Sequence, residues 1–134
     1  MMKTMARSPY QRRLARVRAD RERIICDFSE AVNMTARRLQ AWLDTDESHA
    51  VGWRRAPADE SVGHQSGRRI VRILRTPHAR LTDQDLLHMR TVVGYVRRHL
   101  AQRPFKDIAA SRWAHSLKNW GHDPTKTMTI LSAS

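Results

Sequence analysis

Residues 82–102 read TDQDLLHMRTVVGYVRRHLAQ, and this stretch decides the fold of the chain. Its apolar residues recur every three or four positions, which is the spacing of one face of an α-helix. Thr82 and Asp85 have the types and the separation of a capping box, and Pro104 cannot continue a helix. The pattern predicts a buried central helix over residues 83–102, whose inward stripe consists of Leu86, Met89, Val92, Val93, Val96 and Leu100.

Helix-start and helix-stop residues predict more helices on both sides of this one. Thr35 and Ser66 are typical N-cap residues at the beginning of helical patterns. Pro77 and Gly121 follow such patterns, as stop signals do. No segment alternates between apolar and polar residues for long enough to indicate a strand. The expected helices cover residues 9–32, 35–44, 67–76, 83–102 and 107–120.

The length and composition of the chain favour one helical domain. It has 134 residues, 40% of them hydrophobic, and a chain of this size buries enough surface to fold without a metal or a disulfide. The single cysteine, Cys26, is expected to be a small buried residue. We therefore expect an all-α fold, a compact bundle of four to five helices with a long irregular loop at residues 45–65. The expected parts are a basic N-terminal arm, extended or helical, over residues 1–23, a single helical domain over 24–124 and a C-terminal tail over 125–134.

Positive charge is the most informative feature of the composition. The chain has 25 lysines and arginines against 13 acidic residues, a net charge of +12, and 21 of the 25 are arginines. Residues 1–23 hold half of this excess, since they contain eight basic and two acidic residues. A guanidinium group can donate two hydrogen bonds to a phosphate and can stack on a base, so this composition favours a nucleic acid as the partner.

The uncharged stretches are too short for a membrane segment. The longest is residues 127–134, whereas a helix needs about 20 apolar residues to cross a bilayer. The N-terminus is basic and lacks the apolar core of a secretory signal. We therefore expect a cytoplasmic protein without a membrane partner.

Four arginines are expected on the exposed side of the helix over residues 67–76. Arg68, Arg72 and Arg75 fall within about 60° of one another on a helical wheel, and Arg69 lies beside them. No acidic residue interrupts this run. Cations in a row neutralise successive phosphates and release their counterions. We expect these four arginines to bind nucleic acid, with an ordinary solvated helix face as the alternative.

The basic arm is a second candidate for phosphate contacts. Arg12, Arg13 and Arg16 lie in it, and arms of this kind follow nucleic-acid grooves without reading bases. We expect the arm to project from the domain or to become ordered on a partner. Self-association into a homo-oligomer is the alternative, because an apolar stripe runs from Tyr10 to Val17.

Trp53 is the tryptophan that falls in the expected irregular loop. It directly precedes Arg54 and Arg55, and an exposed aromatic ring beside cations can stack on a base or a sugar. We include these three residues in the candidate site, with anchoring of the loop in the core as the alternative for the ring. The other tryptophans lie on apolar stripes and are expected in the core: Trp42, Trp113 and Trp120.

The histidines do not stand at the spacings of metal ligands. The sequence leaves open whether His64, His99 and His122 converge. His64 and His122 each follow a glycine near an expected helix end, where they are placed to bond backbone carbonyls. Ser66 has no nucleophile-elbow context. We expect no catalytic residue, no metal and no cofactor, and a small enzyme or metal protein is the least favoured interpretation.

Five blocks of the sequence resemble a known family. They are VGW at 51–53, ESVGHQSGRRIV at 60–71, HMRTVVGYV at 88–96, HLAQRP at 99–104 and NWGHDP at 119–124. In this order they resemble the bacterial and fungal family of domain of unknown function thirty-one-forty, over residues 28–124. Some members are labelled DNA-binding. The resemblance implies one contiguous domain, supplies no catalytic residue and leaves the arm before Arg23 outside.

The sequence thus predicts a small basic protein that binds nucleic acid, with DNA as the first candidate, through phosphate contacts that are largely independent of base sequence. A helix-turn-helix is not expected, because the gap from Arg75 to Thr82 is longer than its short turn. The alternative from another class is an interaction module that binds an acidic protein or a second copy of itself.

Overall fold

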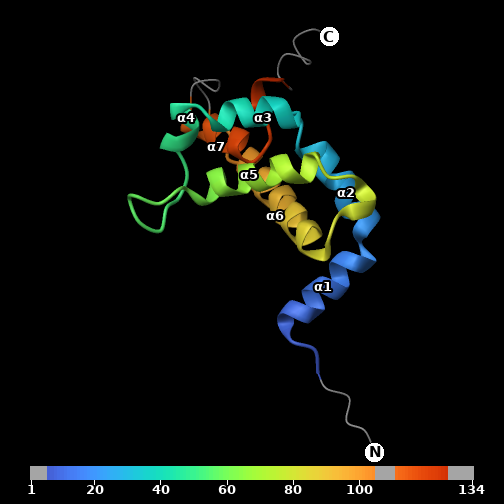
Figure 1. Ribbon diagram of the computed structural model, residues 1–134. Coiled ribbons are helices and arrows are strands. Elements are labelled where there is room, and N and C mark those ends of the chain that lie inside the picture. Colours follow the sequence, from blue (N-terminus) through green and yellow to red (C-terminus); the bar gives the residue numbers. More distant parts are fainter. Residues whose placement is uncertain (1–5, 105–110, 127–134) are drawn as a thin grey trace, which may run out of the picture.

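The computed structural model describes residues 6–104 and 111–126, and within these ranges every regular element is a helix (Figure 1). The all-α expectation is confirmed. The elements are α1 (Pro9–Ala19), α2 (Arg21–Ala31), α3 (Ala36–Leu43), α4 (Asp46–Ala50), α5 (Val62–Leu74), the 3-10 helix η1 (His78–Arg80), α6 (Asp83–Leu100) and α7 (Arg112–Asn119).

Helix α6 is the centre of the structure, as its sequence pattern predicts. It packs against α1, α2, α5 and α7. The predicted capping box is present: the Asp85 backbone N–H donates to Thr82 Oγ1 at 3.1 Å, and the Thr82 N–H donates to Asp85 Oδ2 at 3.0 Å. Leu100 differs from the prediction, because it lies in the last turn and stays partly exposed. The buried stripe is Leu86, Met89, Val92, Val93 and Val96.

Charged residues interrupt the surface of α6 along its length. Among residues 6–104 and 111–126, neither α6 nor any other helix combines the length and the hydropathy needed to cross a membrane.

The predicted N-terminal helix is two helices, because the chain bends at Asp20. Because of this bend, both helices pack against α6. Val17 of α1 is fully buried, and Phe28 of α2 is nearly so. Arg18 Nε donates to Asp83 Oδ2 at 2.5 Å, which joins α1 to the first turn of α6. The N-terminal half of α1 points away from the other helices (Figure 1). The arm is therefore helical from Pro9 and is held to the core at its second half.

The expected loop at residues 45–65 is partly helical, because it contains α4 and the start of α5. Ser61, not Ser66, caps α5: its Oγ accepts from the His64 N–H at 3.1 Å. Gly67 reads as a helix start in the sequence, yet it lies within α5. A Cβ at this position would approach the Asn119 carbonyl oxygen and Leu43 Cδ2 to 2.6 Å. This glycine therefore allows close packing between α5 and its neighbours.

A buried amide joins the helices on one side of α6. Asn119 Oδ1 accepts from Trp42 Nε1 at 2.7 Å and from Ser48 Oγ at 2.5 Å, and its Nδ2 donates to the Ser48 carbonyl at 3.0 Å. Trp42 and Trp120 are buried, as predicted, and Trp113 is half-buried against the core. These bonds connect α3, α4 and α7, and both α3 and α7 also pack against α5.

Cys26 is exposed, so the prediction that it is buried is wrong. Ile24, Ile25 and Phe28 of α2 face the core. Cys26 lies on the opposite side of this amphipathic helix and faces solvent.

Candidate nucleic-acid interface

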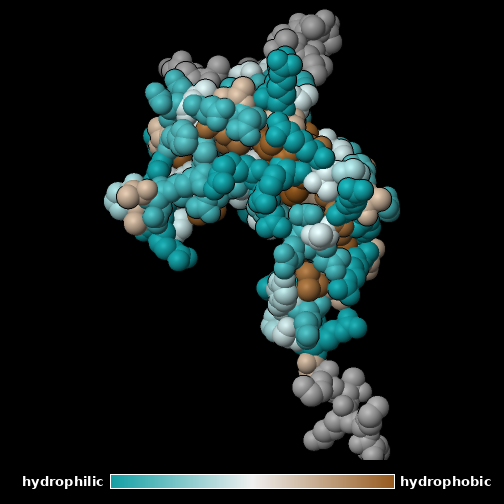
Figure 2. Space-filling view, viewed as in Figure 1, coloured by the Kyte–Doolittle hydropathy of each residue, from teal (hydrophilic) through white to brown (hydrophobic). Residues whose placement is uncertain are grey.

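The predicted arginine face lies on the exposed side of α5, where Figure 2 shows a hydrophilic band. Two of its arginines have carboxylate partners from other segments. Arg68 donates to both oxygens of Glu60, from Nε at 2.9 Å and from Nη2 at 2.5 Å. Arg69 Nη2 lies 3.6 Å from Asp85 Oδ1 of α6. No acidic residue interrupts these arginines in the sequence, but the fold places two carboxylates, those of Glu60 and Asp85, beside them.

The second half of the face is unpaired. Within the part of the chain that the structure describes, no carboxylate lies within ion-pair distance of Arg72 or Arg75, and both side chains are exposed. Their charge is therefore available to a partner without the loss of an internal ion pair.

Three of these arginines border an open hollow of about 460 Å³ between α5 and α6. We call it the arginine hollow; its lining is Val62, Gln65, Ser66, Arg68, Arg69, Arg72, His88, Thr91 and Trp120. Arg75, at the C-cap of α5, does not reach it. The hollow thus combines concentrated positive charge with hydroxyl, amide and aromatic groups.

His88 forms part of the lining of the arginine hollow. Burial, together with the charge of Arg69, lowers the pKa of His88 to about 4, so its ring is neutral at pH 7. Ser66 Oγ lies 2.9 Å from His88 Nε2, which fixes the orientation of the ring. The charge of the hollow therefore comes from the arginines, while His88 and Ser66 add neutral hydrogen-bonding groups.

A smaller hollow of about 160 Å³ adjoins the first one. We call it the tryptophan hollow; its lining is Gly52, Trp53, Val62, Gly63, Tyr95, Ser116, Asn119 and Trp120. The rings of Tyr95 and Trp120 stack at a centroid distance of 4.1 Å. Trp53 is 67% exposed and Val62 is 45% exposed. Because Val62 and Trp120 line both hollows, the two form one continuous surface.

One face of α6 connects these hollows with α1. Gln84, His88, Thr91 and Tyr95 repeat at helical spacing on this face, over roughly 16 Å of helix. At its start, Gln84 Nε2 donates to the hydroxyl of Tyr10 at 3.2 Å. We call the two hollows and this row of residues the α5–α6 face. In Figures 1 and 2 the outline of the molecule bends inward between α1 and the loop that precedes α5.

The arm residues occupy the exposed part of α1. Arg12, Arg13 and Arg16 are all exposed, and the guanidinium of Arg13 lies 5.9 Å from the centre of the Tyr10 ring. Tyr10 in turn bonds to Gln84 at the start of the α5–α6 face. Arg13 is therefore connected to this end of the face through Tyr10.

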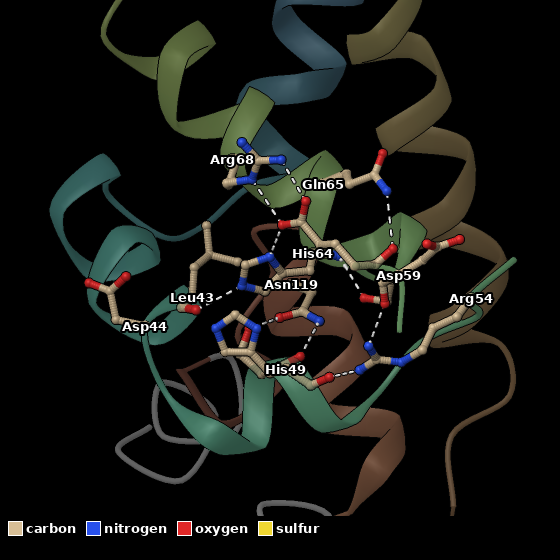
Figure 3. Close-up of polar contacts among 12 residues, drawn as sticks. Leu43, Asp44, His49, Arg54, Asp59, His64, Gln65, Arg68 and Asn119 are labelled. Atoms are coloured by element: carbon tan, nitrogen blue, oxygen red, sulfur yellow. Dashed lines mark hydrogen bonds and ion pairs between the residues drawn. The ribbon is translucent and has the colours of Figure 1, made fainter. Parts of the chain in front are cut away.

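The two arginines after Trp53 have different environments. Arg54 donates to the carbonyls of Asp59, at 2.7 Å, and of His49, so it holds the loop in shape (Figure 3). Arg55 is exposed and lines a third hollow, of about 420 Å³, together with Trp53, Asp59 and Glu60. Of the candidate residues, the structure brings together Trp53, Arg68, Arg69 and Arg72, and it leaves Arg12, Arg16 and Arg75 outside this surface.

The three histidines that the sequence leaves open each have a separate partner. His64 Nε2 lies 2.8 Å from the Leu43 carbonyl at the end of α3 (Figure 3), and His122 Nδ1 lies 2.7 Å from the Ala31 carbonyl at the end of α2. The predicted bonds to helix-end carbonyls are confirmed for both. His99 Nε2 lies 3.2 Å from the Trp113 carbonyl. In residues 6–104 and 111–126, no group of three or more His, Cys, Asp or Glu residues is arranged to hold a metal.

The sequence interpretation missed the contributions of α6 to the surface. His88, Thr91 and Tyr95 line the hollows, and the signal for them was available, since their spacing places them on the polar side of the predicted central helix. The stacking of His49 on His64, with ring centroids 4.1 Å apart, had no local signal.

Residues 27–118 match the family described as Protein of unknown function (DUF3140), which covers more than half of the chain. The chain belongs to this family. The DUF3140 segment includes α3 to α6 entirely, and with them the three arginines of the hollow, Trp53 and His88. It leaves out α1 and Trp120. The chain has no match among curated proteins and none among solved structures.

Proposed function

We propose that the protein binds nucleic acid, with DNA as the first candidate, through the α5–α6 face. The observation that supports this most is the convergence of Arg68, Arg69 and Arg72 on one open hollow of a chain that carries a net charge of +12. Three guanidinium groups on one helix bind successive phosphate oxygens and release counterions.

The arginines contribute in different ways. Arg72 has no carboxylate partner within the described residues, so a phosphate adds an interaction there without displacing one. Arg68 and Arg69 exchange part of their bonding to Glu60 and Asp85 for bonds to phosphate. The contacts go to phosphates and not to base edges, so binding is largely independent of sequence.

The exposed arginines of α1 add electrostatic attraction from outside the family segment. Arg12, Arg13 and Arg16 increase the rate of encounter and the salt dependence of binding. The protein acts in the bacterial cytoplasm in this proposal. The proposal includes no catalytic role; Ser66 is buried in α5, with its Oγ 2.9 Å from His88 Nε2.

Fluorescence anisotropy with a labelled DNA duplex over a range of salt concentrations tests the proposal. Contact with about four to six phosphates predicts a slope of log affinity against log salt of about −4 to −5. Arg72→Ala should make the slope less negative by about 0.9, the contribution of one phosphate. The matched control is Arg37→Ala, which removes the same charge from the exposed surface of α3 and should leave the slope unchanged.

Absence of binding to the duplex and to its separated strands at low salt, or an affinity that does not change with salt, would overturn the proposal. Either result would favour the alternative class, an interaction module for an acidic protein or for a second copy of the chain.

A further inference from the structure

We infer that the tryptophan hollow receives an unpaired base, so that the α5–α6 face prefers a single strand to a duplex. This inference rests on the proposed function and names the form of nucleic acid that the same site takes.

The first argument is the presentation of Trp53. Trp53 is 67% exposed, yet contacts on both sides hold its backbone in place. Val51 is buried, Gly52 adopts a positive φ of 97°, and the Val62 N–H donates to the Trp53 carbonyl at 2.9 Å. A rigid support therefore holds a large apolar ring in solvent, which is the arrangement that a stacking platform needs.

The second argument is the chemistry of the hollow itself. Its walls are Trp53, Val62 and the stacked pair of Tyr95 and Trp120. The buried polar side chain at its edge is already in use, because Asn119 bonds to Trp42 and Ser48. A flat ring fits such a space by stacking, and few free groups are left to distinguish one base from another.

The third argument is the position of the hollow beside the arginines. Val62 and Trp120 line both hollows, so a base next to Trp53 has the cations of Arg68 and Arg72 in the neighbouring space for its phosphates. This charge selects a base over an apolar side chain of an acidic protein as the occupant, because each nucleotide brings its own phosphate. Bases in a duplex are already paired and stacked, and each one costs energy to extrude.

The test compares three probes: a labelled single strand of about 12 nucleotides, the duplex of the same sequence, and an abasic strand of the same length. The single strand should bind more tightly than the duplex at equal salt and should quench the fluorescence of Trp53. Trp53→Ala should weaken binding of the single strand by about fivefold or more, and Trp53→Phe should retain most of the affinity. Binding of the abasic strand, which keeps the phosphates, should be the same for the wild type and Trp53→Ala.

The results separate this inference from the proposed function. If Trp53→Ala leaves the affinity for the single strand unchanged, or weakens the abasic strand and the duplex by the same factor, the base pocket is wrong while the phosphate contacts stand. Absence of binding to all three probes at low salt overturns both. Quenching of Trp53 by an acidic peptide with an aromatic residue, and not by the single strand, assigns the hollow to a protein partner and also overturns the inference. The exposed ring makes Trp53→Ala a mild change, so its melting temperature should match that of the wild type.

Discussion

Arg68 of α5 holds the carboxylate of Glu60 with two hydrogen bonds, although the two residues lie in different segments. These bonds lower the pKa of Glu60, with a smaller contribution from His64, so the carboxylate is ionised at neutral pH. Glu60 is therefore an internal competitor for the arginine that borders the hollow.

Removal of this competitor should strengthen binding of nucleic acid. Glu60→Gln should raise the affinity by about fivefold at low salt, which corresponds to roughly 1 kcal/mol, the upper value for an exposed ion pair. Glu30→Gln, on the exposed surface of α2, removes the same charge elsewhere and should change the affinity much less. Anisotropy titrations measure both, and an unchanged or lower affinity for Glu60→Gln would contradict the prediction.

His88 should titrate well below the usual range of histidine. Burial lowers its pKa to about 4, whereas the ring in an unfolded chain has its ordinary value of 6.5. The neutral folded ring therefore contributes stability that is present above pH 6.5 and is lost as the pH falls from 6.5 to about 4, because the unfolded chain binds the proton first. An NMR titration of the ring protons should have its midpoint near pH 4.

The stability of His88→Gln should depend less on pH in this interval. Thermal unfolding of the wild type and of His88→Gln at several pH values measures the difference between their melting temperatures. This difference should shrink as the pH falls from 6.5 to 4. A difference that is constant over the interval would show that the buried ring is not the group that titrates.

Val62→Asp should separate binding from stability. Val62 is the first residue of α5, where a negative charge interacts favourably with the helix N-terminus, by about 0.3–1 kcal/mol. The same charge lies between the two hollows and repels phosphates. We expect an unchanged or higher melting temperature together with weaker binding of nucleic acid. The neutral variant Val62→Ser is the control, and equal binding by the two variants would argue against phosphate contacts at this surface.

Two glycines in helices should respond to alanine in opposite ways. At Gly67 the new methyl group meets the backbone of Asn119 and the side chain of Leu43, so we expect a loss of about 1–3 kcal/mol in the free energy of unfolding. At Gly94 it meets only the flexible end of Arg98, and we expect a gain of about 0.5–1 kcal/mol. Urea denaturation measures both. A mild effect at Gly67 would mean that α5 can move away from α7.

The parts of the fold that were predicted correctly depend on local patterns. The apolar stripe and the capping box of α6 both lie within one helix, so the sequence contains all that is needed to find them. The start of α5 was wrong because Ser61 and Ser66 are both suitable caps, and Gly67 looked like a boundary. The close approach of α7 and of Leu43 in α3 explains the glycine at this position in the helix.

The candidate site shows the same limit. Its arginines were found from their spacing, but the acids that pair with them were not. Glu60 precedes α5, and Asp85 lies in the first turn of α6, so the run itself gives no sign of either. The exposure of Trp53 was also undecided, because it depends on how the loop folds over α7.

The burial of Val17 determines how the role of the arm can be examined. This residue of α1 is fully enclosed by the core, and Arg18 bonds to the first turn of α6. A chain shortened to begin after Arg23 would lose part of its hydrophobic core along with six units of net positive charge. Reduced binding by such a truncation could then come from lost stability or from lost charge. Replacing Arg12, Arg13 and Arg16 with glutamine in the full-length chain removes the charge and keeps the helix in place.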